Sequence, residues 1–151
     1  MARKIATVVI DAEGRDYGKV FQLREMPAMQ AERWAMRALL ALAKSGVEIP
    51  ENIANAGLAG VAALGLKAFG GLDFADAEPL LTEMMSCVQI IPDPAKPQIV
   101  RFLVDDDIEE VPTLLKLRAE VFSLHTGFSL PAAASKSTST TTGKKAAGRN
   151  T

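Results

Sequence analysis

Residues 5–23 read IATVVIDAEGRDYGKVFQL, and this segment predicts that the protein contains a β-sheet. The β-branched run Ile5–Ile10 favours a strand. The polar residues that follow include Gly14, which can adopt a positive φ, and are typical of a turn. Tyr17–Leu23 then has the alternation of a second strand, so the segment indicates an antiparallel hairpin. Four residues are expected on one face of that second strand: Tyr17, Lys19, Phe21 and Leu23.

An isolated hairpin is only marginally stable, so other elements must cover it. A helix is predicted over Ala28–Lys44, with Pro27 in its first turn and Ser45-Gly46 as its end. Its apolar stripe contains Trp34, which we expect to pack in the core.

The second predicted helix runs roughly from Glu51 to Phe69 and stops at Gly70-Gly71. After Glu51 its only charged residue is Lys67, and it is rich in alanine and glycine. A helix with so little charge is expected to be buried on most sides.

A third helix begins at Asp73 or Asp76. Asp76 is favoured because Pro79 is tolerated only in a first turn. We expect this helix to continue to Val88, which shares a face with Leu80 and Met84.

The C-terminal part of the domain contains a predicted strand and a last helix. Pro92–Pro97 is a stiff non-helical crossing, and Ile99–Val104 could join the hairpin in a three-stranded sheet. The last helix is expected to start at about Glu110 or Val111, to end near His125 and to stop at Gly127.

These elements predict an α+β fold in which residues 1–130 form one domain. A small antiparallel sheet, made of the N-terminal hairpin and one later strand, packs on about four helices. Residues 131–151 contain no large apolar side chain and are expected to form a disordered tail. This tail carries four of the 17 basic residues and no acidic one, which leaves 13 basic and 18 acidic residues, a net charge of -5, in residues 1–130.

The sequence offers little material for catalysis. Cys87 is the only cysteine and His125 the only histidine, so no disulfide, multi-cysteine metal site or catalytic triad can form within the chain. We expect Cys87 to be a buried, inert thiol and His125 to interact with the end of the last helix. Asp105–Asp107, with Glu109 and Glu110, does not match a calcium-binding loop and is expected to cap that helix. We therefore expect no enzyme, no cofactor and no metal.

The residues after Met1 lead into a β-branched run and not into the apolar core of a signal peptide, and the uncharged run Asn52–Leu66 is too short to cross a bilayer, so we expect neither a secretion signal nor a membrane segment. A single cysteine fits a reducing compartment, so a cytoplasmic protein is expected. Neither a membrane partner nor a specific nucleic-acid partner is indicated by the acidic balance of residues 1–130.

Four segments resemble a known family. They are Glu25–Leu42, Glu78–Pro94, Asp106–Val111 and Leu117–Phe128, and the likeness extends over roughly Tyr17 to Leu130. Together they are similar to the tail assembly chaperones of tailed bacteriophages and prophages. The resemblance implies a small protein of the bacterial host cytoplasm that binds the hydrophobic tape-measure protein, keeps it soluble and helps to recruit tail-tube subunits. It implies no catalytic residues.

The partner-binding surface is expected between Ile53 and Val88, where Ala, Leu and Met outnumber charged residues. The candidate residues are Phe69, Phe74, Leu81, Met84 and Met85.

Two other classes of function remain open: a structural virion protein, such as a minor tail or connector subunit, and a small nucleic-acid-associated regulator that uses the basic tail. The lysines near Gly143 also permit a longer product made by ribosomal frameshifting, with the tail as a linker. The sequence predicts no particular oligomeric state.

Overall fold

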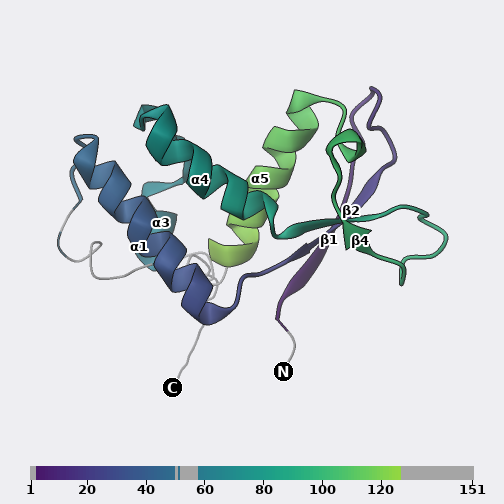
Figure 1. The fold of residues 1–151 in the computed structure, drawn as a ribbon, viewed down its shortest axis with the longest axis horizontal. Helices are drawn as coiled ribbons and strands as arrows, with labels where there is room; N and C mark the ends of the chain where they lie inside the picture. Colours follow the sequence, from purple (N-terminus) through teal and green to yellow (C-terminus); the bar gives the residue numbers. More distant parts are fainter. Residues whose placement is uncertain (1–2, 50, 52–57, 127–151) are drawn as a thin grey trace, which may run out of the picture.

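The computed structural model describes residues 3–49, 51 and 58–126. The expected stop at Gly127, the tail over 131–151 and most of the first half of the second predicted helix lie outside these residues. The sheet occupies one side of the molecule, α1, α3 and α4 the other, and α5 lies between them (Figure 1). The elements are β1 (Ile5–Val9), β2 (Val20–Arg24), α1 (Ala28–Lys44), α3 (Leu58–Leu64), η1 (Leu66–Gly71), α4 (Phe74–Met85), β3 (Val88–Ile91), β4 (Arg101–Phe102), η2 (Asp105–Asp107) and α5 (Val111–Thr126).

The α+β class is confirmed, with a four-stranded antiparallel sheet in the order β1-β2-β3-β4. The N-terminal hairpin forms as predicted, with Val8 opposite Phe21. Its second strand starts at Val20, however, so Tyr17 and Lys19 belong to the connecting loop and Tyr17 is exposed.

The later strands differ from the prediction. Val88 was expected at the end of a helix, but it begins β3 and pairs with Leu23 of β2. The helix ends earlier because the Ser86 N–H bonds back to the Thr82 and Glu83 carbonyls, and an apolar, partly β-branched run then follows. The strand predicted over Ile99–Val104 is reduced to the two residues of β4 at the edge of the sheet.

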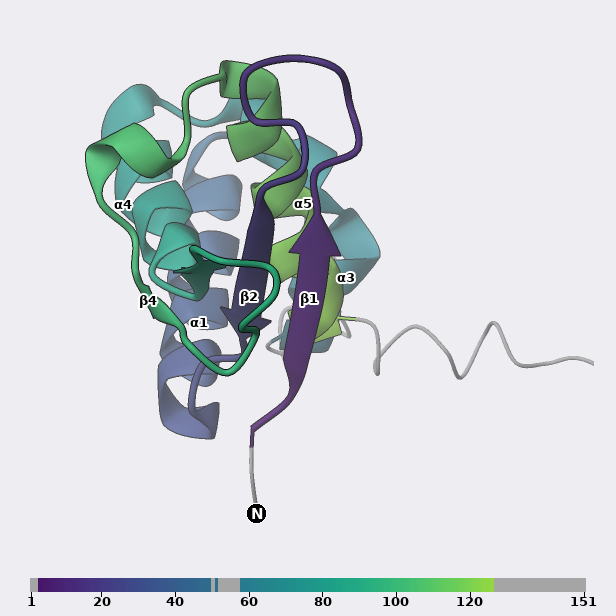
Figure 2. The same ribbon diagram turned by 90° about the vertical axis from the view of Figure 1, so that its right-hand side faces the viewer.

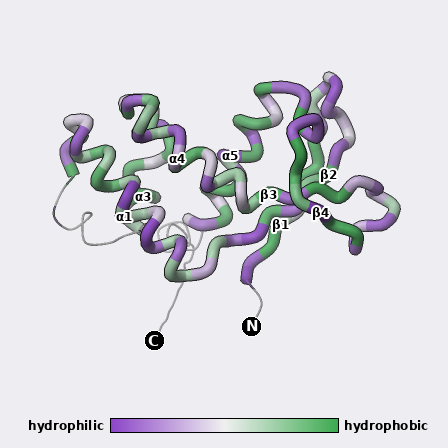
Figure 3. Tube along the Cα trace, in the orientation of Figure 1, coloured by the Kyte–Doolittle hydropathy of each residue, from purple (hydrophilic) through white to green (hydrophobic). Residues whose placement is uncertain are grey.

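Helix α1 has the predicted bounds. Pro27 precedes its first residue, and the helix ends at Lys44, followed by Ser45 as its C-cap and Gly46 at a φ of 99°. Hydrophobic and hydrophilic segments alternate along its trace, as expected for a helix with one buried face (Figure 3).

The second predicted helix is broken. α3 ends at Leu64, Gly65 adopts a φ of 82°, and the chain continues as the short 3-10 helix η1. A positive φ cannot continue an α-helix, so the prediction of one helix reaching Phe69 was wrong. In the part that follows Leu58, Val61 is fully enclosed and Ala62 and Phe69 are buried, whereas Ala59 and Lys67 are exposed, so the predicted burial holds for one side of the segment only.

The start of α4 also differs from the prediction. The helix begins directly after Asp73 rather than after Asp76, and Pro79 lies inside it as its sixth residue. Asp76 instead lies in the first turn and forms an ion pair with Lys44 at 3.5 Å. The expected restriction of Pro79 to a first turn was therefore wrong.

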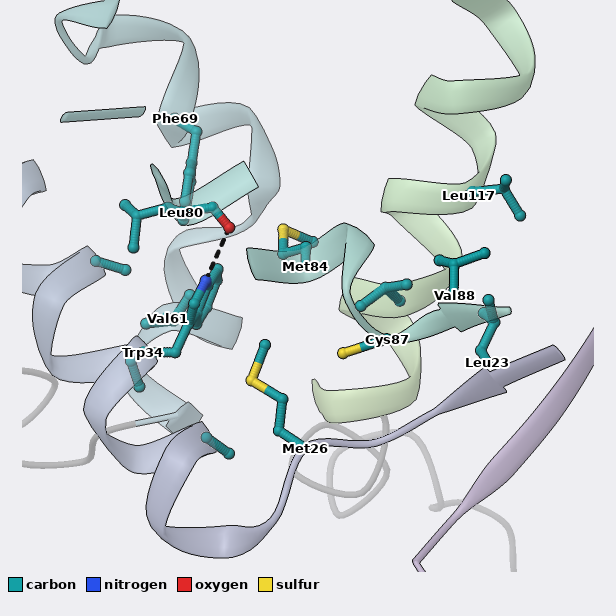
Figure 4. Close-up of a cluster of buried hydrophobic side chains, with 14 of the residues drawn as sticks. Leu23, Met26, Trp34, Val61, Phe69, Leu80, Met84, Cys87, Val88 and Leu117 are labelled. Atoms are coloured by element: carbon teal, nitrogen blue, oxygen red, sulfur yellow. Dashed lines mark hydrogen bonds between the residues drawn. The ribbon is translucent and has the colours of Figure 1, made fainter. Parts of the chain in front are cut away.

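The core lies where α1, α4 and α5 meet the inner face of the sheet (Figure 4). The Trp34 indole N–H donates to the Leu80 carbonyl at 3.0 Å, and its ring stacks on Phe69 with centroids 5.8 Å apart. The prediction that Trp34 packs in the core is therefore confirmed.

The start of α5 is capped from the other end of the chain. The buried Asp16 carboxylate accepts the Glu109 N–H at 3.0 Å and the Glu110 N–H at 3.0 Å, and it pairs with Lys19 at 2.8 Å. The acidic run was expected to provide this cap, but Asp107 accepts hydrogen bonds from Val104 N–H and the Arg101 guanidinium instead.

His125 has a different role from the one expected. It is buried, its Nε2 accepts the Met26 N–H at 2.8 Å, and its Nδ1 lies 2.9 Å from the Val121 carbonyl. Because Nε2 accepts a hydrogen bond, it carries no proton, and the ring proton is on Nδ1, which donates to the Val121 carbonyl. His125 is therefore a neutral link between α5 and the start of α1, not a positive charge at a helix end.

Candidate partner-binding surface

The five residues predicted to bind a partner do not form one surface. Phe69 and Met84 lie in the core, with exposed fractions of 6% and 1%, and so offer no contact area in this conformation. Phe74 is 76% exposed, whereas Leu81 and Met85 are half-buried. These last three are spaced by seven and four residues and therefore share one face of α4.

A second exposed apolar set lies on α1 and was not predicted. Met29, Met36 and Leu40 are 75%, 41% and 65% exposed, and we call them the α1 stripe. They too are spaced by seven and four residues, so they line one face of the helix, opposite the face that buries Trp34 and Leu42. That spacing is visible in the sequence, but the sequence does not show which of the two apolar stripes of the helix is left outside the core.

Beside the α1 stripe, α1 and α4 enclose a surface groove of about 330 Å³. Leu40 and Ala41 line one wall, and Pro79 and Leu80 line the other. The remaining lining residues are Arg37, Lys44, Ala75 and Asp76.

Polar contacts link the antiparallel helices α1 and α4 beside the groove. Lys44 at the end of α1 pairs with Asp76 at the start of α4, and Arg37 pairs with Glu83 about two helical turns further along. Gln30 also donates to Glu83, at 2.8 Å. Burial raises the pKa of Glu83, but the hydrogen bonds from Arg37 and Gln30 outweigh it and lower that pKa below its usual value. Glu83 therefore stays ionised and keeps both helices in register.

The chemistry of this face suits a helical partner. An exposed apolar stripe next to a groove can receive the apolar side of an amphipathic helix. Two members of the stripe are methionines, whose flexible side chains adapt to different partner surfaces. Arg33, which is exposed on the same side of α1, adds a positive charge to the rim.

Cys87 is buried, as predicted, and burial raises the pKa of its thiol to about 11. A thiol with so high a pKa is protonated at neutral pH and is a poor nucleophile. Within residues 3–49, 51 and 58–126, no three His, Cys, Asp or Glu side chains are grouped as metal ligands. In the same part of the chain, no helix combines the length and apolarity that crossing a bilayer requires.

Comparisons of the chain with protein-family models, with curated proteins and with solved structures gave no match.

Proposed function

We propose that this protein binds a hydrophobic partner protein through the α1 stripe and the adjoining groove, and that it acts as a phage tail assembly chaperone. The client in this proposal is the tape-measure protein, and tail-tube subunits are a second partner. The protein would act in the cytoplasm of the bacterial host and carry out no chemical reaction.

The observation that carries the proposal is the exposure of the α1 stripe. α1 already buries a complete apolar face, so Met29, Met36 and Leu40 are not needed to fill the core. Exposed apolar side chains that line up on one helix beside a groove are typical of protein-interaction sites. The resemblance of four segments to tail assembly chaperones is the reason for proposing the tape-measure protein as the client.

The exposed face of α4 is the neighbouring candidate. Phe74 projects from the start of α4, and Leu81 and Met85 follow it on the same face. Substitutions at Leu40 and Phe74 therefore distinguish the two faces of the helical layer: Leu40→Glu should weaken client binding more than Phe74→Glu. If the two substitutions weaken client binding equally, both faces contact the client.

Mass spectrometry of purified virions separates a chaperone from a structural protein. A chaperone leaves before the tail is complete, so its peptides should be missing while those of the tape-measure protein are present. Peptides of this chain at the stoichiometry of a tail subunit would contradict the proposal and favour a minor tail or connector protein.

A further inference from the structure

Strand β1 forms an edge of the sheet with an unused row of backbone groups. Backbone bonds join Glu25 N–H to the Lys4 carbonyl and Ile10 N–H to the Lys19 carbonyl, so residues 4 and 10 direct their backbone groups toward β2. Because this direction alternates along a strand, Ile5, Thr7 and Val9 direct theirs away from β2. Among the residues that the structure describes, no strand pairs with that side of β1.

The strand also lacks the features that normally protect an edge. β1 carries no charge and no proline, and Ile5 and Val9 are 47% and 52% exposed. The helices lie behind the hairpin, on the other face of the sheet, and leave the outer edge of β1 uncovered in this view (Figure 2).

The sequence of β1 is complementary to itself in one antiparallel register. If Thr7 lies opposite Thr7 of a second copy, Ile5 lies opposite Val9 and Ala6 opposite Val8. All outward-facing backbone groups of Ile5, Thr7 and Val9 are then paired, because each such pair exchanges two hydrogen bonds. Thr–Thr and paired β-branched side chains are also favourable cross-strand neighbours.

The charged residues at the two ends of β1 favour the same register, with Thr7 opposite Thr7. Arg3 and Asp11 flank the strand, and with Thr7 at the centre Arg3 of one copy lies opposite Asp11 of the other, on both sides of the two-fold axis. Both residues are exposed, and neither has an ion-pair partner within the described part of the chain; Arg3 Nη1 donates only to the Glu25 carbonyl, at 3.3 Å. A slip of the register by two residues places Asp11 opposite Ile5 or Arg3 opposite Val9, so the Arg3–Asp11 pairs are lost. In the first of these registers Arg3 faces Glu13, but Glu13 lies in the bend after β1 and not in the strand.

We propose that two copies of this chain pair through β1 in this register and join their sheets into one continuous eight-stranded antiparallel sheet. The pairing leaves the α1 stripe of each copy free, because that stripe lies in the helical layer. It does not depend on the identity of the client.

A charge swap tests the register in the full chain. Sedimentation velocity over a range of concentrations gives the dimer dissociation constant of the wild type, Arg3→Asp, Asp11→Arg and the double variant. Each single variant puts like charges together twice and should raise this constant by roughly tenfold, and the double variant should restore it. A wild type that stays monomeric, or single variants that dimerise normally, would overturn the proposal.

Cross-linking tests the same contact by distance. Hydrogen-bonded pairs have Cα atoms about 5.5 Å apart, within the range of a disulfide. Thr7→Cys should therefore form a covalent dimer on mild oxidation, whereas Ser45→Cys, on the helical layer, should not. Because Cys87 is buried, it should not compete. Equal cross-linking of both variants, or cross-linking of Thr7→Cys to another extended protein in place of a second copy, would contradict pairing between two copies.

Discussion

Asp16 connects two parts of the chain that are 93 residues apart. Its carboxylate is fully buried in the β1–β2 loop and accepts the N–H groups of Glu109 and Glu110 at the start of α5. Lys19 neutralises it, so the loop and the helix are held by a charged hydrogen-bond network. A buried carboxylate with this many partners stabilises the fold only while it is ionised.

Asp16→Asn should lower the free energy of unfolding by about 2–3 kcal/mol, because an amide keeps the shape but loses the charge that holds Lys19 and both backbone donors. Urea denaturation at neutral pH measures the change. Glu13→Gln, an exposed substitution in the same loop, is the matched control and should change the stability by less than about 0.5 kcal/mol. An Asp16→Asn variant as stable as this control would contradict the role given to Asp16.

The same carboxylate predicts a pH dependence. Burial would raise the pKa of Asp16, but the hydrogen bonds from Lys19, Thr113 and the two backbone N–H groups lower it from 3.8 to about 2. The folded pKa is thus below the unfolded one. The contribution of Asp16, about 2 kcal/mol, is complete above pH 3.8 and is lost as the pH falls toward 2.

Wild type and Asp16→Asn should therefore differ most in unfolding free energy at neutral pH and converge between pH 4 and about 2. Urea titrations across this range measure the difference. Asp107 and Glu83 also have lowered pKa values and therefore add to the pH dependence of stability. Their contributions are the same in both proteins and cancel when the unfolding free energy of Asp16→Asn is subtracted from that of the wild type. A difference that does not shrink with acidification would show that Asp16 acts through its shape alone.

His125 should be replaceable only by a residue that can still accept a hydrogen bond from the Met26 N–H. His125→Leu leaves the buried Met26 N–H without an acceptor and should cost about 1–3 kcal/mol in thermal or urea unfolding. His125→Gln retains an acceptor on a side chain of similar length and should recover part of that loss. Equal stability of the two variants would show that packing, and not the hydrogen bond, decides the effect.

At the scale of elements, Gly65 determines where α3 ends. Its φ of 82° is unfavourable for any residue with a Cβ, although a Cβ there would meet open space. Gly65→Ala should therefore cost about 1–2 kcal/mol through the backbone alone, as measured by thermal unfolding. Gly70→Ala, where φ is not positive and the space is also open, should have little effect. If Gly65→Ala and Gly70→Ala lower the stability by similar amounts, backbone strain at Gly65 is not the cause.

The elements that were predicted correctly are those with strong local signals. Pro27 and Ser45-Gly46 bound α1, and the polar turn after Ile10 separates the strands of the hairpin. Val88 was misassigned because a short apolar run has no period long enough to distinguish strand from helix, and its pairing with Leu23 depends on a distant segment. The cap that Asp16 gives to α5 could not be predicted either, since sequence separation does not reveal contacts between loops.

For the whole molecule, the sequence predicts the layers better than it predicts the surface. Composition and pattern indicate a sheet packed on helices, which the structure confirms. The candidate surface was predicted between Ile53 and Val88, because a sequence rich in Ala, Leu and Met does not show which of its apolar residues the core absorbs. Packing places Phe69 and Met84 inside, and it leaves Met29, Met36 and Leu40 on the outside of α1.

We propose that the outer face of α1 keeps a hydrophobic client soluble. Co-expressing the full chain with the tape-measure protein, and measuring the soluble fraction of that client, tests this role. Leu40→Glu should lower that fraction several-fold while the variant stays folded, because it places a charge in the apolar contact. Leu115→Glu changes a similarly exposed leucine on α5 and is the matched control, which should leave solubility unchanged. Two results would contradict this role. The client could be as soluble with Leu40→Glu as with the wild type, or it could be as insoluble with the wild type as when it is expressed alone.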